Sequence, residues 1–143
     1  MTIAPESSSS PKRPRVFLSY ARSDQPQAAK LAKVLEAAGL DLWWDALIEG
    51  GAVFSRKIEA ALEGSDAVIV LWSKASVGSD WVLDEAARGR DLRKLVPVSL
   101  DGTEAPLGFR QYHAISLQHW NGRPDADAVA QGLRAVASGA RHG

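Results

Sequence analysis

The chain lacks cysteine, net charge and any long hydrophobic segment, and each absence excludes a class of protein. Without cysteine there are no disulfides, no cysteine-ligated zinc, no iron–sulfur cluster and no thiol nucleophile. The 17 Lys and Arg are balanced by 17 Asp and Glu, so the positive surplus that non-specific nucleic-acid binding needs is missing. The longest apolar run, Ala67 to Trp72, is far shorter than the ~20 residues that span a bilayer. Residues 1–15 contain no hydrophobic segment of the kind found in secretory signals, so we expect a cytoplasmic protein.

The length of 143 residues fits one domain, and the hydrophobic and charged fractions of 45% and 24% are those of a folded globule. The first dozen residues contain the Ser7–Ser10 run and two prolines and show no periodicity. We therefore expect a disordered leader over residues 1–14, a folded domain over residues 15–138 and a loose tail over residues 139–143.

Short apolar segments alternate with helical patterns between these tails. We expect Asp24 to cap the first helix with its side chain, and Pro97 to disturb the fourth strand because proline cannot donate to a ladder. The predicted strands are Val16–Leu18, Leu40–Trp44, Ala67–Trp72, Leu95–Leu100 and Ala114–Leu117. The predicted helices are Asp24–Ala38, Phe54–Leu62, Ser79–Ala87 and Ala126–Val136.

Strand–helix alternation with short links indicates an α/β fold with a parallel sheet. Right-handed crossovers and five strands favour a flavodoxin-like, three-layer αβα arrangement with strand order 2-1-3-4-5. In such sheets ligands bind beyond the carboxyl ends of the strands where the order reverses, here between strands one and three. The segments that meet there are Ser19–Asp24, Asp45–Phe54 and Ser73–Glu85.

Several common chemistries have no support in these segments. There is no phosphate-binding glycine motif, and the acidic residues of a phospho-accepting receiver domain are missing. The three histidines lie near the fifth strand or in the tail, which argues against a serine–histidine triad or a histidine metal site. What remains is Glu85, four residues after Trp81 on one face of the third helix. The spacing also fits a structural role, with Trp81 in the core and Glu85 paired to Arg88.

The order of several motifs resembles that of Toll/interleukin-1 receptor (TIR) domains, particularly the bacterial branch. The resemblance covers about Arg15 to Trp120, and its last motif but one is the Trp-x-x-x-Glu element. The matching segments are Arg15–Asp24, Gly39–Asp45, Ile58–Ser73, Ser79–Glu85 and Leu95–Leu100.

This resemblance implies an activity and a set of site residues. Enzymatic TIR domains cleave NAD⁺ at the nicotinamide–ribose bond, giving nicotinamide and linear or cyclised ADP-ribose, in signalling or defence. The catalytic glutamate of the family maps onto Glu85 and the stacking tryptophan onto Trp81. Further pocket residues map onto Ser19, Tyr20, Arg22 and Asp45. NAD⁺ is then the substrate, and no cofactor or metal is expected.

The chemistry is plausible from the residues themselves. Nicotinamide leaves NAD⁺ from a cationic ring, so it needs no proton donor, and one ionised carboxylate can stabilise the positive charge that develops on the ribose. We expect the N-terminal end of the helix to favour the ionised form of Glu85. Trp81 could stack on a ring of the substrate, and Arg22 could pair with a phosphate oxygen.

The resemblance also implies assembly. TIR domains act in assemblies, and in some enzymatic members a neighbour's loop completes the pocket. The corresponding loop here is Asp45–Ala52, whose glycines predict mobility. The alternative function is that of a non-enzymatic adaptor that engages other TIR domains, and the sequence does not separate it from the enzyme.

Overall fold

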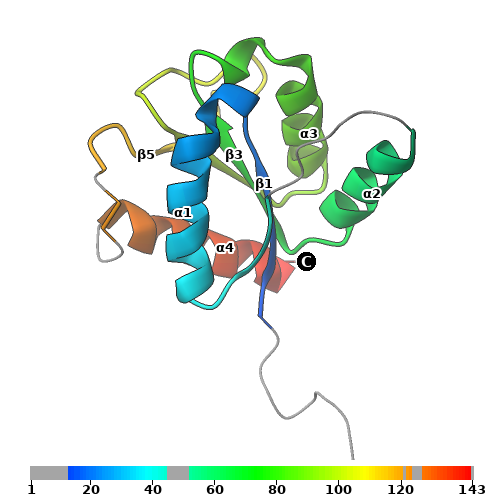
Figure 1. Cartoon of the computed structure of the whole chain (residues 1–143), viewed down its shortest axis with the longest axis horizontal. Coiled ribbons are helices and arrows are strands. Elements are labelled where there is room, and N and C mark those ends of the chain that lie inside the picture. Colours follow the sequence, from blue (N-terminus) through cyan, green and yellow to red (C-terminus); the bar gives the residue numbers. More distant parts are fainter. Residues whose placement is uncertain (1–12, 45–51, 121, 124–126, 143) are drawn as a thin grey trace, which may run out of the picture.

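The computed structural model describes residues 13–44, 52–120, 122–123 and 127–142, and it shows a parallel sheet between two pairs of helices (Figure 1). Five strands form the sheet in the order β2-β1-β3-β4-β5, and every neighbouring pair is parallel. The predicted fold class and strand order are confirmed. In chain order the elements are β1 (Arg15–Ser19), η1 (Arg22–Asp24), α1 (Gln25–Ala37), β2 (Asp41–Trp43), α2 (Ala52–Glu63), β3 (Ala67–Trp72), η2 (Ser76–Gly78), α3 (Asp80–Asp91), β4 (Leu95–Ser99), β5 (Ile115–Ser116) and α4 (Asp127–His142).

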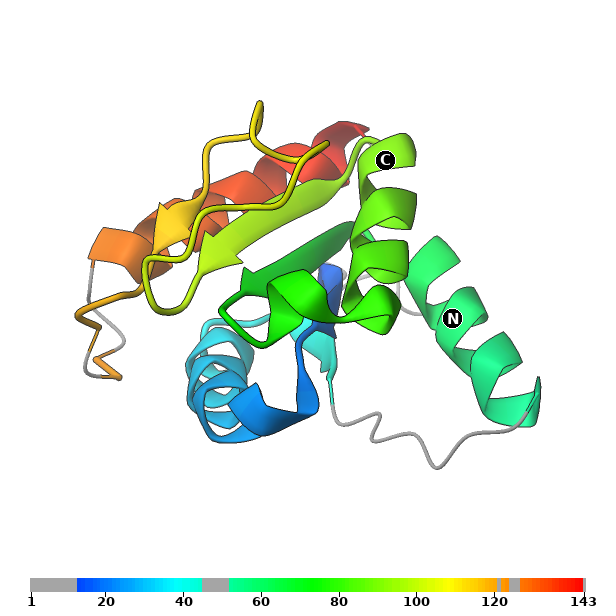
Figure 2. The ribbon, with the colours of Figure 1, turned by 90° about the horizontal axis from the view of Figure 1, so that it is seen from above.

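The alternation of side chains along the strands divides the core between the two faces of the sheet. On one face, Leu18 and Ile69 pack with residues of α1 and α4. On the other face, Phe17 and Val68 pack with α2, while Trp72 packs with α3. Figure 2 shows α1 and α4 on one side of the sheet and α2 and α3 on the other. All six residues of β3 are buried, as expected of a central strand covered on both faces.

The C-terminal helix is longer than the sequence pattern predicts. We expected the helix to end at Val136 and residues 139–143 to form a loose tail, but the backbone of α4 stays helical to His142. Val136 is completely buried, and Ala137 after it is exposed. The boundary was wrong because hydrophobic periodicity marks where a helix packs, whereas the backbone hydrogen bonds can continue beyond that point. Among the described residues, no helix combines the length and hydrophobicity of a membrane span.

Pro97 lies in a regular strand, and the expected irregularity at this position was wrong. Its partner in the adjacent β3 is Val70, and the register stays continuous from Leu95 to Ser99. The carbonyl of Ser99 accepts a hydrogen bond from Leu117 on the β5 side, so the backbone of Pro97, two residues earlier, is directed to that side too. Because β5 pairs with β4 only from Val98 onward, no ladder donor is needed at Pro97.

Gly89 sets the distance between α3 and the sheet, which makes it a sensitive position. A Cβ atom added at Gly89 would lie 2.9 Å from the Cβ of Val68 on β3, closer than real Cβ contacts. We expect Gly89→Ala to lower the free energy of unfolding by about 1–3 kcal/mol, because α3 must move outward.

Gly132 is the matched control for this prediction. A Cβ there meets no atom of the described residues within 4 Å beyond its own helix backbone. Gly132→Ala should raise the free energy of unfolding by about 0.5–1 kcal/mol through helix propensity alone. Urea denaturation measures both, and equal effects of the two substitutions would contradict close packing at Gly89.

Candidate functional site

The candidate site lies at the carboxyl ends of β1 and β3, where the strand order reverses. Ser19 is the last residue of β1, and Glu85 lies in the second turn of α3, which follows β3 through η2. Ser79, where the sequence placed the start of the third helix, caps α3, since its Oγ accepts a hydrogen bond from the Val82 backbone N–H at 3.3 Å. The cap fixes where the helix begins, and therefore which of its side chains are directed toward β1.

Glu85 and Ser19 form a direct contact inside this region. The Ser19 hydroxyl donates a hydrogen bond to Glu85 Oε1 at 2.6 Å, and the two residues are only 1% and 8% exposed. The alternative pairing of Glu85 with Arg88 is wrong. Arg88 instead donates to Glu63 of α2, with 2.8 Å between Nη2 and Oε1, on the exposed surface. A buried carboxyl group bonded to a buried hydroxyl is costly to maintain, and such groups gather at functional sites.

Burial changes the acidity of Glu85. Loss of hydration raises its pKa to about 7, the hydrogen bonds from Ser19 and Trp81 oppose the rise, and the charge of Asp84 adds to it. The expectation that the helix N-terminus would favour the ionised form is therefore outweighed by burial. Near neutral pH the group exchanges between the neutral and the ionised state.

Trp81 is directed outward rather than into the core. It is 42% exposed, although it lies only one turn before Glu85. The alternative interpretation of Trp81 as a core anchor is thus wrong, and the core tryptophan of this region is the fully buried Trp72. The exposed indole offers a surface on which a planar ring can stack, directly beside a carboxyl group that can take part in chemistry.

The remaining predicted site residues lie at different depths. Tyr20 follows β1 and is half-buried, while Arg22 in η1 is exposed. Asp45 and most of the predicted Asp45–Ala52 loop lie outside the described residues, and α2 begins at Ala52. The structure thus brings Ser19, Trp81 and Glu85 together. Among the described residues, no cluster of three or more His, Asp or Glu could hold a metal ion.

A second polar network at the same edge was missed by the sequence analysis. Asp24 does not cap α1 with its side chain; its carboxylate accepts a short hydrogen bond from the Ser73 hydroxyl. Ser76 Oγ in turn accepts from the Ser73 backbone N–H at 2.7 Å. The network links the segment after β1, which contains Tyr20, to the segment after β3, which leads to Trp81. Asp24 directly precedes α1, so its position in the chain predicted a helix cap. Ser73 lies 49 residues away and comes within reach only because β1 pairs with β3.

Comparison with known families gives this arrangement its context. A family model of the TIR domain matches residues 16–133, which is most of the chain. The chain belongs to the TIR domain family. No curated protein sequence matches it.

Solved TIR structures share the fold at low sequence identity. The TIR domain of the Toll-related receptor TRR-2 from Hydra magnipapillata superimposes with a TM-score of 0.70 and 20% identity, covering 85% of this chain and 97% of that one. The TIR domains of the activated Roq1 resistosome give 0.63 and 18%, covering 86% and 99%. A TIR-STING receptor from C. gigas gives 0.66 and 23%, covering 85% of this chain and 38% of the receptor. At these identities the similarity shows the fold alone.

Proposed function

We propose that this TIR domain is an NAD⁺ glycohydrolase that cleaves the nicotinamide–ribose bond and uses Glu85 as its single catalytic carboxylate. The observation that carries the proposal is the buried hydrogen bond between Ser19 and Glu85 at the switch point, beside the exposed ring of Trp81. The TIR family includes NAD⁺-cleaving enzymes, which supports the assignment. The proposed setting is bacterial signalling or defence.

In the proposed mechanism, Glu85 acts in its ionised form. As the bond to nicotinamide breaks, positive charge develops on the ribose, and a carboxylate within a poorly hydrated site stabilises that charge strongly. The leaving ring becomes neutral on departure, so no acid is required. Water or a group of the substrate then attacks the ribose, giving linear or cyclised ADP-ribose.

Ser19 and Trp81 have supporting roles in this mechanism. Hydrogen bonds from both side chains lower the pKa of Glu85 and so favour the ionised form against burial. The Ser19 bond also fixes the orientation of the carboxylate. We propose that Trp81 stacks on a ring of NAD⁺ and that Arg22, exposed at the same edge, pairs with a phosphate oxygen.

Self-association is the second part of the proposal. We propose that a second copy of the chain, through its loop Asp45–Ala52, completes the substrate site. Nicotinamide release should then rise faster than linearly with protein concentration, and a crowding agent should increase it. Strict proportionality over a wide concentration range would contradict the assembly requirement, and a folded domain that released no nicotinamide would instead indicate an adaptor.

The proposed stacking role of Trp81 can be tested by steady-state kinetics. We expect Trp81→Ala to raise KM for NAD⁺ about tenfold, as loss of stacking on one base does, and Trp81→Phe to raise it less. Trp120, on the far side of the sheet against the α1 and α4 core, gives the control Trp120→Phe. An unchanged KM in Trp81→Ala would show that the exposed ring does not contact the substrate.

A further inference from the structure

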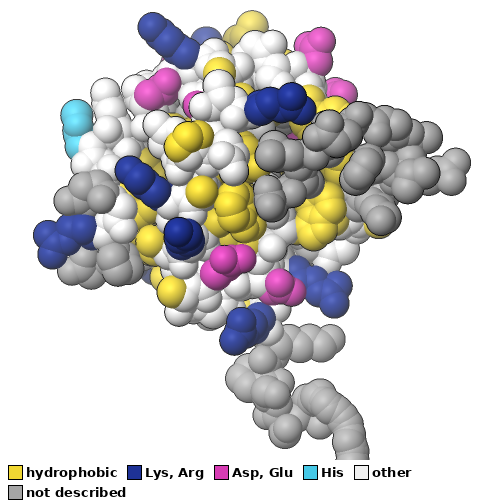
Figure 3. Space-filling view, viewed as in Figure 1, with side chains coloured by type: hydrophobic (Ala, Val, Ile, Leu, Met, Phe, Trp, Pro, Cys, Tyr) yellow, Lys and Arg dark blue, Asp and Glu magenta, His cyan; other side chains and the backbone are white. Residues whose placement is uncertain are grey.

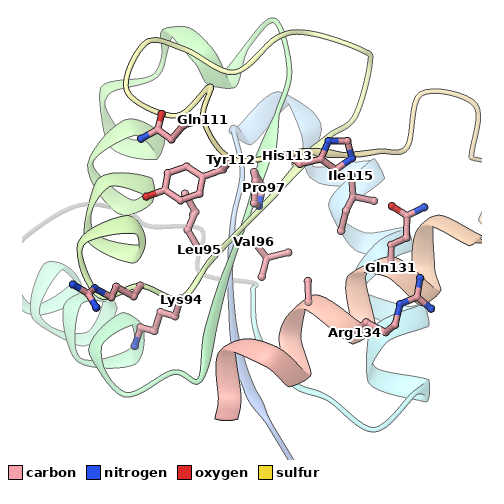
Figure 4. A pocket seen from close by; sticks show the side chains of 12 residues that line it. Lys94, Leu95, Val96, Pro97, Gln111, Tyr112, His113, Ile115, Gln131 and Arg134 are labelled. Atoms are coloured by element: carbon pink, nitrogen blue, oxygen red, sulfur yellow. The ribbon is translucent and has the colours of Figure 1, made fainter. Parts of the chain in front are cut away.

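A cavity of about 620 Å³ lies along β4, and none of the candidate site residues lines it (Figure 4). Small-molecule sites typically occupy ~300–1,000 Å³. Leu95, Val96 and Pro97 form its apolar floor, the segment 111–113 forms one wall, and α4 forms the other. These three residues begin β4, whereas the candidate site lies at the carboxyl ends of β1 and β3.

The floor includes an open sheet edge. Strand β5 pairs with β4 only at Val98 and Ser99, so no strand among the described residues covers the edge between Leu95 and Pro97. The Leu117–Ser99 hydrogen bond shows which side of β4 faces β5, and strand alternation directs the backbone groups of Leu95 and Pro97 to that same side. At this edge the backbone carbonyls of Leu95 and Pro97 can accept hydrogen bonds and the Leu95 N–H can donate one. These groups can pair with the donors and acceptors along the edge of a planar ring.

Positive charge is concentrated around this cavity although the whole chain is neutral. Charged side chains of both signs are interspersed on the face shown in Figure 3. The lining of the cavity, in contrast, contains Arg93, Lys94 and Arg134 and no acidic residue. The Lys94 ammonium is already held by the carbonyls of Glu63 and Ser65, at 3.0 and 2.6 Å. The guanidinium groups of these two arginines make no hydrogen bond or ion pair within the described part of the chain, so they remain for an anionic ligand.

Arg93 also has an unusual backbone conformation. Its φ of 61° places it in the left-handed region, where a helix ends with glycine most often. It is the only described residue other than glycine with such a φ. An arginine therefore stands at the end of α3 where backbone geometry favours glycine, and it lines the cavity.

We propose that this cavity binds a nucleoside phosphate. The ring of Tyr112, 37% exposed, lies on one side of Pro97 and Val96, and Arg134 lies on the other side (Figure 4). The base stacks on Tyr112 above the apolar floor, and the phosphates pair with Arg134. This second ligand site is independent of the proposed hydrolysis at Glu85.

Titration of the ¹⁵N-labelled chain with ADP, followed by amide chemical shifts, tests the proposal. Shifts should cluster in residues 93–96, 111–113 and 131–135, and adenosine and pyrophosphate should each bind at least tenfold more weakly than ADP. Arg134→Ala and Tyr112→Ala should each raise the Kd for ADP at least tenfold. The control Lys33→Ala, an exposed cation on α1, should change it less than twofold. The same titration on Glu85→Gln should give the wild-type Kd.

Four results would overturn the proposal. An unchanged Kd in Arg134→Ala would remove the phosphate contact, and pyrophosphate binding as tightly as ADP would remove the nucleoside. Shifts confined to Ser19, Trp81 and Glu85 would assign ADP to the candidate hydrolase site. Shifts along β4 that appear on raising the protein concentration without ADP would show that a second copy covers the cavity.

Discussion

Glu85→Gln is expected to reduce nicotinamide release at least about a hundredfold while leaving the domain folded. Glutamine has the shape of glutamate and keeps an oxygen that can accept the 2.6 Å hydrogen bond from Ser19. It carries no negative charge at any pH, so it cannot stabilise the positive charge that develops on the ribose. The loss should therefore appear in kcat rather than in KM.

A matched control separates this charge effect from a general change in the helix. Asp91→Asn removes a carboxylate from the other end of α3, where the side chain is exposed and faces Arg90. Nicotinamide release by this variant should stay within about twofold of the wild type, because exposed pairs contribute little. Equal rates for wild type and Glu85→Gln, measured by chromatography of free nicotinamide, would refute catalysis by Glu85.

The second large effect is a dependence on pH. Both the activity and the stability of the protein should change with pH because the pKa of Glu85 is raised. With a pKa of about 7, the active ionised form is a minor species at pH 6 and the major species at pH 8. We expect kcat/KM for NAD⁺ to rise about tenfold per pH unit below 7 and to level off above it. Ser19→Ala, which removes a hydrogen bond that lowers this pKa, should move the rise to higher pH.

The stability prediction has the opposite sign. The folded state binds the Glu85 proton up to about pH 7, whereas the unfolded chain releases it near the ordinary value of 4.5. The contribution of Glu85 to stability is thus complete below pH 4.5 and is lost as the pH rises to about 7, by a total of about 3 kcal/mol. In urea denaturation the difference between wild type and Glu85→Gln should follow this window. A difference that does not change between pH 4.5 and 7 would show that Glu85 is not desolvated in the folded protein.

The sequence predicted the sheet well because its strongest signals are local. The run Ala67–Trp72 is apolar at every position, and the structure gives it the same bounds as β3. The predicted start of the third helix at Ser79 was also correct, and Ser79 caps this helix through a contact between residues three apart in the chain. Asp24 carries the same kind of local signal but uses its side chain elsewhere, and no local pattern reports the approach of Ser73.

For the candidate site, the sequence proposed residues but did not indicate their burial or acidity. The motif spacing and the family resemblance singled out Ser19, Trp81 and Glu85, and the structure brings these side chains together. Nothing in the amino-acid order indicated that Glu85 is buried, because the neighbouring Asp84 and Arg88 are charged residues typical of a helix surface. Burial of this carboxyl group depends on how closely α3 packs on the sheet, and Gly89 allows the helix to approach Val68 of β3.

The amino-acid order by itself determined the fold class and the strand order, because both depend on the periodicity of apolar residues along the chain. The family followed from the resemblance of several motifs in series, and the catalytic role of Glu85 stays a proposal drawn from that resemblance. Only the tertiary structure decided that Glu85 contacts Ser19, that its pKa is raised, that Trp81 is exposed, and that Arg93 and Arg134 line one cavity. These properties arise between segments up to 66 residues apart, and hydration and distance across such gaps are set by packing.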